Sequence, residues 1–80
     1  MLTKLALEKY KVQSTGADGG HSYIITEIEH NRKTRKLVVL FSNKSDEQNL
    51  KENIKIQIKG YLVDEGEEYD LIISNATIEK

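Results

Sequence analysis

The most concentrated charge in this chain of 80 residues is a basic run, Arg32-Lys33-Thr34-Arg35-Lys36. Clusters of lysine and arginine attract backbone phosphates and are the electrostatic footprint of nucleic-acid binding. Proteins that bind single strands add aromatic side chains on which bases stack, and this chain has four tyrosines, one phenylalanine and no tryptophan. These residue types predict a nucleic-acid-binding site, whose candidate residues are Tyr23, Arg32, Lys33, Arg35, Lys36, Lys55, Lys59 and Tyr61.

Acidic residues form a second cluster nearer the C-terminus. Its members are Asp64, Glu65, Glu67, Glu68 and Asp70. Their spacing lacks the alternating aspartates and the glycine of an EF-hand calcium loop. A solvated acidic turn is therefore the default interpretation of this segment.

The two histidines, His21 and His30, bracket a short apolar segment. A zinc site needs three or four converging ligands, and the chain has no cysteine and no His-x-x-x-His spacing. Hydrolytic chemistry needs an activated nucleophile or two carboxylates with separated pKa values, and no such constellation is visible. We therefore expect no metal, no cofactor and no enzymatic activity.

Length and composition predict one globular domain over residues 1–80. Hydrophobic residues make up 38% of the chain and charged residues 31%, which is ordinary for a folded domain. The formal net charge of -1 hides an asymmetry, because the first forty residues hold seven Lys or Arg against four Asp or Glu, and the last forty hold five against nine. No apolar run approaches the roughly 20 residues that span a bilayer. We expect a cytoplasmic protein without membrane contact, although the absence of cysteine also fits an exported one.

Alternation of apolar and polar residues with period 2 dominates the chain and predicts strands. The expected strands cover residues 5–14, 22–29, 35–42, 54–63 and 69–78, with helix as the competing interpretation of residues 2–11. In the first strand, Lys9, Lys11 and Gln13 share one face. The glycine-rich residues 15–20 predict a turn. The third strand is apolar on both faces, which is typical of a strand buried on both sides.

One short helix is expected within residues 42–53, since Ser45 suits an N-cap and Asp46-Glu47 would follow it in the first turn. Leu50 would anchor this segment to the core. Gly60 interrupts an otherwise strong strand, and a glycine there indicates a bulge, a bend or a close backbone approach.

Five strands with a helix between the third and the fourth resemble the OB-fold, a small Greek-key barrel. The resemblance is carried by residues 36–43, 53–60 and 70–79, which are similar to the last three strands of OB domains related to the anticodon-binding modules of tRNA synthetases. It implies a ligand face on strands 2 and 3, flanked by the loops between strands 1 and 2 and between strands 4 and 5. The acidic turn would lie beside that face, where negative charge repels phosphate.

Two functions remain open from the sequence. The first is a non-enzymatic module that binds single-stranded DNA or RNA weakly. The second is a protein-interaction or accessory domain of a larger assembly, which the near-neutral charge and the few aromatic residues favour. Exposure of Tyr23, Tyr61 and Tyr69 on one concave face with lysines or arginines between them would support nucleic acid, and burial of these tyrosines would support a protein partner.

Overall fold

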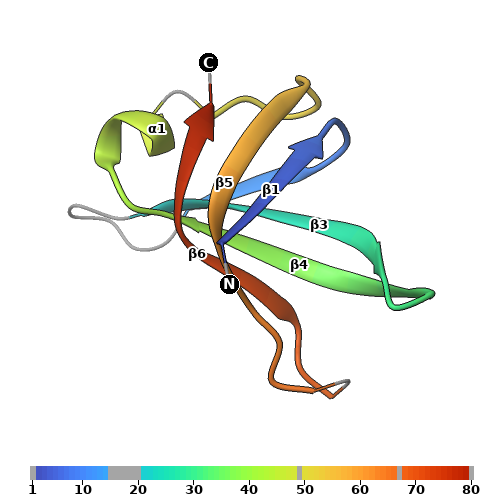
Figure 1. Ribbon diagram of the computed structural model, residues 1–80. Helices are drawn as coiled ribbons and strands as arrows, with labels where there is room; N and C mark the ends of the chain where they lie inside the picture. The colour runs from blue at the N-terminus through green and yellow to red at the C-terminus, as the bar shows by residue number, and fades with distance from the viewer. Residues whose placement is uncertain (1, 15–20, 49, 67, 80) are drawn as a thin grey trace.

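The computed structural model describes residues 2–14, 21–48, 50–66 and 68–79. In this part of the chain one sheet contains β1 (Leu2–Leu7), β2 (Lys11–Ser14), β3 (Ser22–His30), β4 (Lys33–Phe41), β5 (Ile56–Val63) and β6 (Leu71–Glu79). The strand order is β1-β5-β6-β4-β3-β2, and only the β4–β6 pair is parallel. The sheet curls into a half-barrel whose two edge strands are consecutive in the chain (Figure 1). The expected all-β class with one short helix is confirmed, and the strand order is compatible with an OB-like fold.

The expected first strand over residues 5–14 is divided in two. β1 pairs with β5 and β2 pairs with β3, so the chain changes neighbour at residues 8–10. The Thr26 hydroxyl donates a hydrogen bond of 2.7 Å to the carbonyl of Lys9, which holds this junction against β3. The alternation of side chains shifts by one residue at the break, because Leu5 and Leu7 face the core before it and Tyr10 and Val12 face the core after it.

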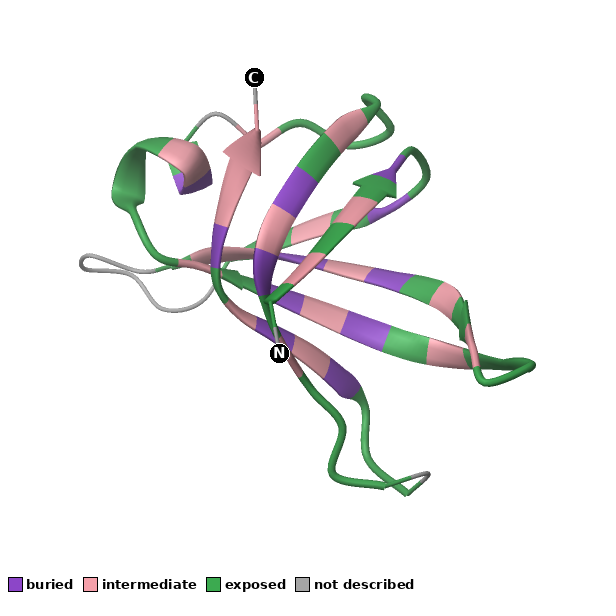
Figure 2. Cartoon of the chain, viewed as in Figure 1, coloured by how far each residue is buried: buried purple, intermediate pink, exposed green. Residues whose placement is uncertain are grey.

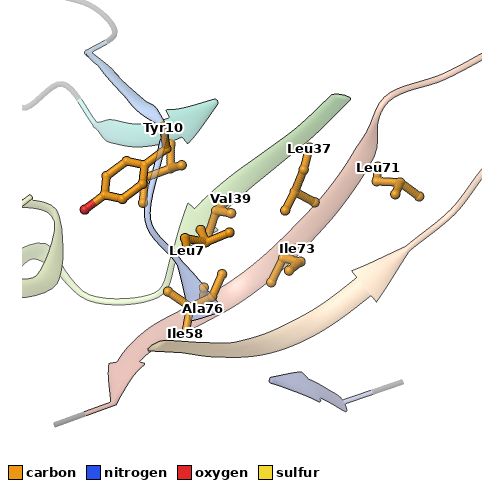
Figure 3. Packing of buried hydrophobic residues seen from close by; sticks show 9 residues of the cluster. Leu7, Tyr10, Leu37, Val39, Ile58, Leu71, Ile73 and Ala76 are labelled. Atoms are coloured by element: carbon orange, nitrogen blue, oxygen red, sulfur yellow. The ribbon is translucent and has the colours of Figure 1, made fainter. Parts of the chain in front are cut away.

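The core lies inside the curl, where inward residues of all the long strands meet (Figure 3). Its buried members are Leu7, Tyr10, Ile24, Leu37, Val39, Ile58, Leu71, Ile73 and Ala76. Each large aliphatic side chain stabilises the fold by about 1.5–3 kcal/mol through its removal from water. Leu50 packs against this cluster as expected.

β4 is buried on one face only, which corrects the expectation of a strand covered on both sides. Leu37 and Val39 are fully buried, but Leu40 on the opposite face is 42% exposed. Figure 2 shows the alternation of buried and less buried residues along β3 and β4. No described element covers the second face, because the single helix α1 (Lys44–Gln48) lies at one end of the half-barrel. An apolar strand face is therefore left open.

The connections are tighter than the sequence suggested. β4 begins at Lys33, two residues earlier than expected, because Asn31 and Arg32 form a two-residue turn with φ of 51° and 67°. Helix α1 begins at Lys44, and its N-cap is Asn43 instead of Ser45: the Asn43 Oδ1 accepts a 2.9 Å hydrogen bond from the N–H of Asp46. The glycine-rich turn expected at residues 15–20 lies outside the described residues.

Gly60 lies where β6 approaches β5 closely, as the position of this glycine in the strand suggested. The β5–β6 register shifts between Lys59 and Tyr61, which marks a bulge. A Cβ at Gly60 would lie 2.5 Å from the Cγ2 of Ile73 and 2.9 Å from the carbonyl oxygen of Ser74. The glycine is required because β6 leaves no room for a side chain.

None of the described helices is long and apolar enough to cross a membrane.

Candidate nucleic-acid interface

The outer side of β2, β3 and β4, which we call the groove face, is set by strand register. Directly paired residues of neighbouring strands point to the same side of a sheet, and Ile25 pairs with both Lys11 and Val38. In the next row, Tyr23 pairs with both Gln13 and Leu40. The groove face therefore combines apolar side chains with lysines at one end.

Three adjoining grooves run along this face and share residues. The first encloses about 580 Å³ and includes Tyr23, Leu40 and Phe41. It shares Ile25 with the second, of about 630 Å³, which in turn shares Lys36 with a third of about 300 Å³. The shared residues make one continuous track past the outer side of the β3–β4 hairpin.

The middle groove is lined by three lysines. Lys9, Lys11 and Lys36 line it together with Glu27 and Glu52. One of the two carboxylates is engaged, because Glu52 accepts a 2.8 Å hydrogen bond from the N–H of Val12. Glu27 lies opposite Lys36 in the β3–β4 register. The local balance is positive but small, which suits weak binding of a polyanion.

Tyr23 is the aromatic residue of the first groove. It is half-buried, and its hydroxyl donates a 3.1 Å hydrogen bond to the Oε1 of Gln13. That bond holds the ring beside Gln13 on the groove face, where Leu40 is the cross-strand neighbour of Tyr23. A held, partly exposed ring is what base stacking needs.

Glu47 closes the α1 end of the first groove. It is only 6% exposed, and its carboxylate accepts hydrogen bonds from the N–H of Ser22 at 2.6 Å and from the His21 ring at 3.3 Å. Burial raises the pKa of Glu47, but these hydrogen bonds and the charges of His21 and Lys44 lower it more, so that the pKa lies below its ordinary value. Glu47 thereby ties α1 to the start of β3.

Arg35 lines the third groove, but its guanidinium is engaged by the acidic turn. Its side chain is 10% exposed, and its guanidinium donates to the Oδ1 of Asp64 at 3.0 Å. It also donates to the carbonyl oxygens of Gly66 and Tyr69, at 2.5 and 2.6 Å. Arg35, which the sequence suggested as a phosphate ligand, instead positions the β5–β6 loop through these hydrogen bonds.

The acidic turn is partly neutralised by the basic hairpin. Asp64 accepts from the N–H of Gly66 and from Arg35, and these two hydrogen bonds hold the pKa of Asp64 below its ordinary value. The Nε2 of His30 lies 3.4 Å from the Oδ2 of Asp64. Tyr69, which follows in the same loop, is 60% exposed and lines the third groove beside Lys36.

Arg32 and Lys33 lie at the tip of the β3–β4 hairpin. Both are exposed, and Lys33 lines the third groove. Arg32 adopts a left-handed φ of 67°, a conformation that costs a non-glycine residue about 1–2 kcal/mol. The hairpin therefore presents this cation at some cost in stability.

The remaining candidates, Lys55, Lys59 and Tyr61, line none of the three grooves. Lys55 precedes β5 and is exposed, while Lys59 and Tyr61 point outward from β5, where they pair with Lys4 and Leu2 of β1. Tyr23 and Tyr61 are both accessible, but Leu40 and Ser74 lie in the row between them and no cation does. The tyrosines are accessible, but they do not share one concave face with cations between them, so the arrangement that would support nucleic acid is not present.

Sequence reasoning missed Lys9 and Lys11 as site residues. Their signal was their alternation with Gln13, because Gln13 pairs with Tyr23 and so places the lysines on the groove face. Among the described residues, no group of three or more His, Asp or Glu side chains is arranged to hold a metal ion.

Searches of protein-family models, of curated proteins and of solved structures found no match to this chain.

Proposed function

We propose that this chain is a non-enzymatic binding module of the OB class, cytoplasmic and akin to the anticodon-binding-like domains, that binds single-stranded DNA or RNA on its groove face. The observation that carries the proposal is the continuous track in which Tyr23 and Ile25 adjoin Lys9, Lys11 and Lys36. Bases would stack on the apolar half and phosphates would contact the lysines. Tyr69 would offer a second stacking position beyond Lys36.

The charge of the site sets the strength and salt dependence of binding. Three lysines and two carboxylates predict weak, micromolar binding. For about three phosphate contacts to a single strand, the logarithm of the association constant should fall with the logarithm of salt concentration with a slope of about -2.

Fluorescence anisotropy with a labelled oligothymidine of about ten nucleotides tests the proposal. Replacing Lys9, Lys11 and Lys36 together by Ala should abolish binding at low salt. The matched control replaces Lys4, Lys55 and Lys59 by Ala, which removes the same charge from elsewhere on the surface and should change the affinity little. Equal losses in both variants would show non-specific attraction and contradict a site on the groove face.

A protein partner is the second candidate, and a specific observation favours it. Leu2, Tyr61 and Val63 are 49%, 49% and 38% exposed and gather on β1 and β5, away from the lysine track. Exposed apolar side chains that gather on one surface are typical of protein interaction sites.

A further inference from the structure

The side chain of Glu47 lines the first groove together with Tyr23, the ring on which a base would stack. The Oε1 of Glu47 accepts a 2.6 Å hydrogen bond from the N–H of Ser22, which directly precedes Tyr23 in β3. The carboxylate is therefore anchored one residue away from the stacking ring, in the same groove.

This carboxylate has hydrogen-bonding capacity beyond the contacts that it makes within the described chain. An ionised carboxylate only accepts hydrogen bonds, at about four lone-pair positions on its two oxygens. Two groups reach those of Glu47, the N–H of Ser22 and the Nδ1 of His21. Burial raises the pKa of Glu47, but the hydrogen bonds and the nearby positive charges lower it more. Glu47 is therefore ionised at neutral pH and can accept a further donor.

The rest of the groove makes this acceptor selective. Its other side chains include four large apolar ones, Ile25, Val38, Leu40 and Phe41. A ligand held between apolar walls loses contact with water, and a polar group that is buried without a partner is penalised. A ligand atom beside Glu47 is therefore favoured if it donates a hydrogen bond and disfavoured if it only accepts one.

The nucleobases differ in this respect. Cytosine and adenine carry an exocyclic amino group, which donates, whereas thymine and uracil carry a carbonyl oxygen at the corresponding position, which only accepts. Carboxylate side chains accept from the amino group of cytosine in protein–DNA complexes.

We propose that Glu47 selects bases with an exocyclic amino group, cytosine or adenine, in the first groove and discriminates against thymine and uracil. The base would stack on Tyr23 and donate from its amino group to the Glu47 carboxylate. The inference rests on the proposed function, because it assigns the base preference of the same site. Oligothymidine cannot make this contact, so its binding tests the proposed function without testing the selectivity.

Fluorescence anisotropy with labelled oligodeoxycytidine and oligodeoxyuridine, each of about ten nucleotides, tests the selectivity at neutral pH. The two probes share their sugar, phosphate charge and ring size and differ in the hydrogen-bonding edge of the base. We expect oligodeoxycytidine to bind about fivefold more tightly, which is the low end of the discrimination of a base contact. Equal affinities would overturn the selectivity and leave the proposed function standing. Failure of these two probes and of oligothymidine to bind at low salt would overturn both.

Glu47→Gln assigns the preference to this side chain. An amide presents a donor as well as an acceptor, so the preference for oligodeoxycytidine should fall below about twofold. The NMR spectrum of the variant checks that it is folded, since Glu47 also ties α1 to β3. The wild-type comparison of the two probes decides the selectivity even if the variant is destabilised.

Asp46→Asn is the matched control. It removes the same charge from the same helix, it keeps an oxygen that can accept from the N–H of Ile78, and Asp46 does not line the groove. This variant should retain the preference of the wild type. A preference that persists in folded Glu47→Gln, or that Asp46→Asn loses to the same extent, would overturn the role of Glu47.

Discussion

The groove face and the β1 edge both expose apolar side chains, but they differ in how the main chain beneath them is paired. On the groove face the main chain is paired on both sides of β3 and β4, and the outer edge of β2 is covered by Glu52 and Asn53. A ligand on the groove face would therefore contact side chains only. β1 pairs with β5 on one side, and no described strand pairs with it on the other. The comparison shows that two regions of one small sheet differ chemically: the groove face presents side chains over a paired main chain, and β1 is an edge strand with no strand beyond it in the described structure.

The largest expected effect comes from Gly60, which supports the β1–β5 side. Gly60→Val places a side chain against Ile73 and the carbonyl of Ser74, and overpacking of this kind should reduce the free energy of unfolding by about 2–3 kcal/mol. Urea denaturation measures the loss. Gln57→Val, an outward substitution on the same strand, is the control and should leave stability nearly unchanged. A neutral Gly60→Val would mean that β6 does not approach β5 as closely as described.

Tyr10→Phe tests the cover over the β2 edge. It removes the hydroxyl that lies between the carbonyls of Lys51 and Ile54 in a site only 5% exposed, which should cost about 1–2 kcal/mol. The amides of Tyr10 and Val12 should then exchange faster with solvent, so that β2 becomes more like β1. Tyr61→Phe, whose ring is exposed, should have little effect; equal effects in the two variants would contradict the difference between the edges.

Lowering the pH should weaken the contacts at the α1 end of the groove face before it affects β1, because β1 carries no acidic residue of its own. The pKa of Glu47 is lowered in the folded protein from an ordinary value of 4.5, so its ionised form stabilises the fold above about that pH. This stabilisation is lost as the pH falls through the lower, folded-state pKa. Thermal unfolding from pH 7 to pH 3 should show a steeper loss in the wild type than in Glu47→Gln. Asp64, whose pKa is also lowered, contributes a further loss that Asp64→Asn should remove. Identical profiles for wild type and Glu47→Gln would exclude this role of Glu47.

Arg32→Gly should have the smallest effect on stability. Glycine relieves the left-handed conformation of Arg32 but adds entropy to the unfolded chain, so the two effects offset to within about 1 kcal/mol. If the hairpin tip contacts phosphate, the variant should nevertheless bind oligonucleotide more weakly at low salt. Unchanged binding would restrict the site to Lys9, Lys11 and Lys36.

Much of the fold could be predicted from local alternation. β3 begins at the expected Ser22, and β5 and β6 end at or next to the expected residues. The division of the first strand could not be foreseen, because it depends on contacts of Tyr10 with residues more than 40 positions away. The N-cap was misassigned for a similar reason: Ser45 and Asn43 are both good caps, and the fold decides which one begins the helix.

The candidate site was predictable only in part. Tyr23 and Lys36 do lie on the groove face, and the alternation of Lys9, Lys11 and Gln13 contained the rest of the signal. Arg35 could not be distinguished from its neighbours in the basic run, because its contacts with Asp64, Gly66 and Tyr69 form only when the β5–β6 loop folds beside the hairpin. Lys55, Lys59 and Tyr61 were grouped with the site by residue type, although the sheet places Lys59 and Tyr61 beside β1.

Mapping the oligonucleotide contact by NMR tests the central proposal most directly. Unlabelled oligothymidine is added to the labelled protein at low salt, and shifts of backbone amides and lysine side chains are followed residue by residue. The proposed function predicts shifts at Lys11, Tyr23, Ile25 and Lys36 that reverse when salt is raised, with β1 unaffected. No shifts at low salt, or shifts confined to β1 and β5, would contradict a nucleic-acid site on the groove face.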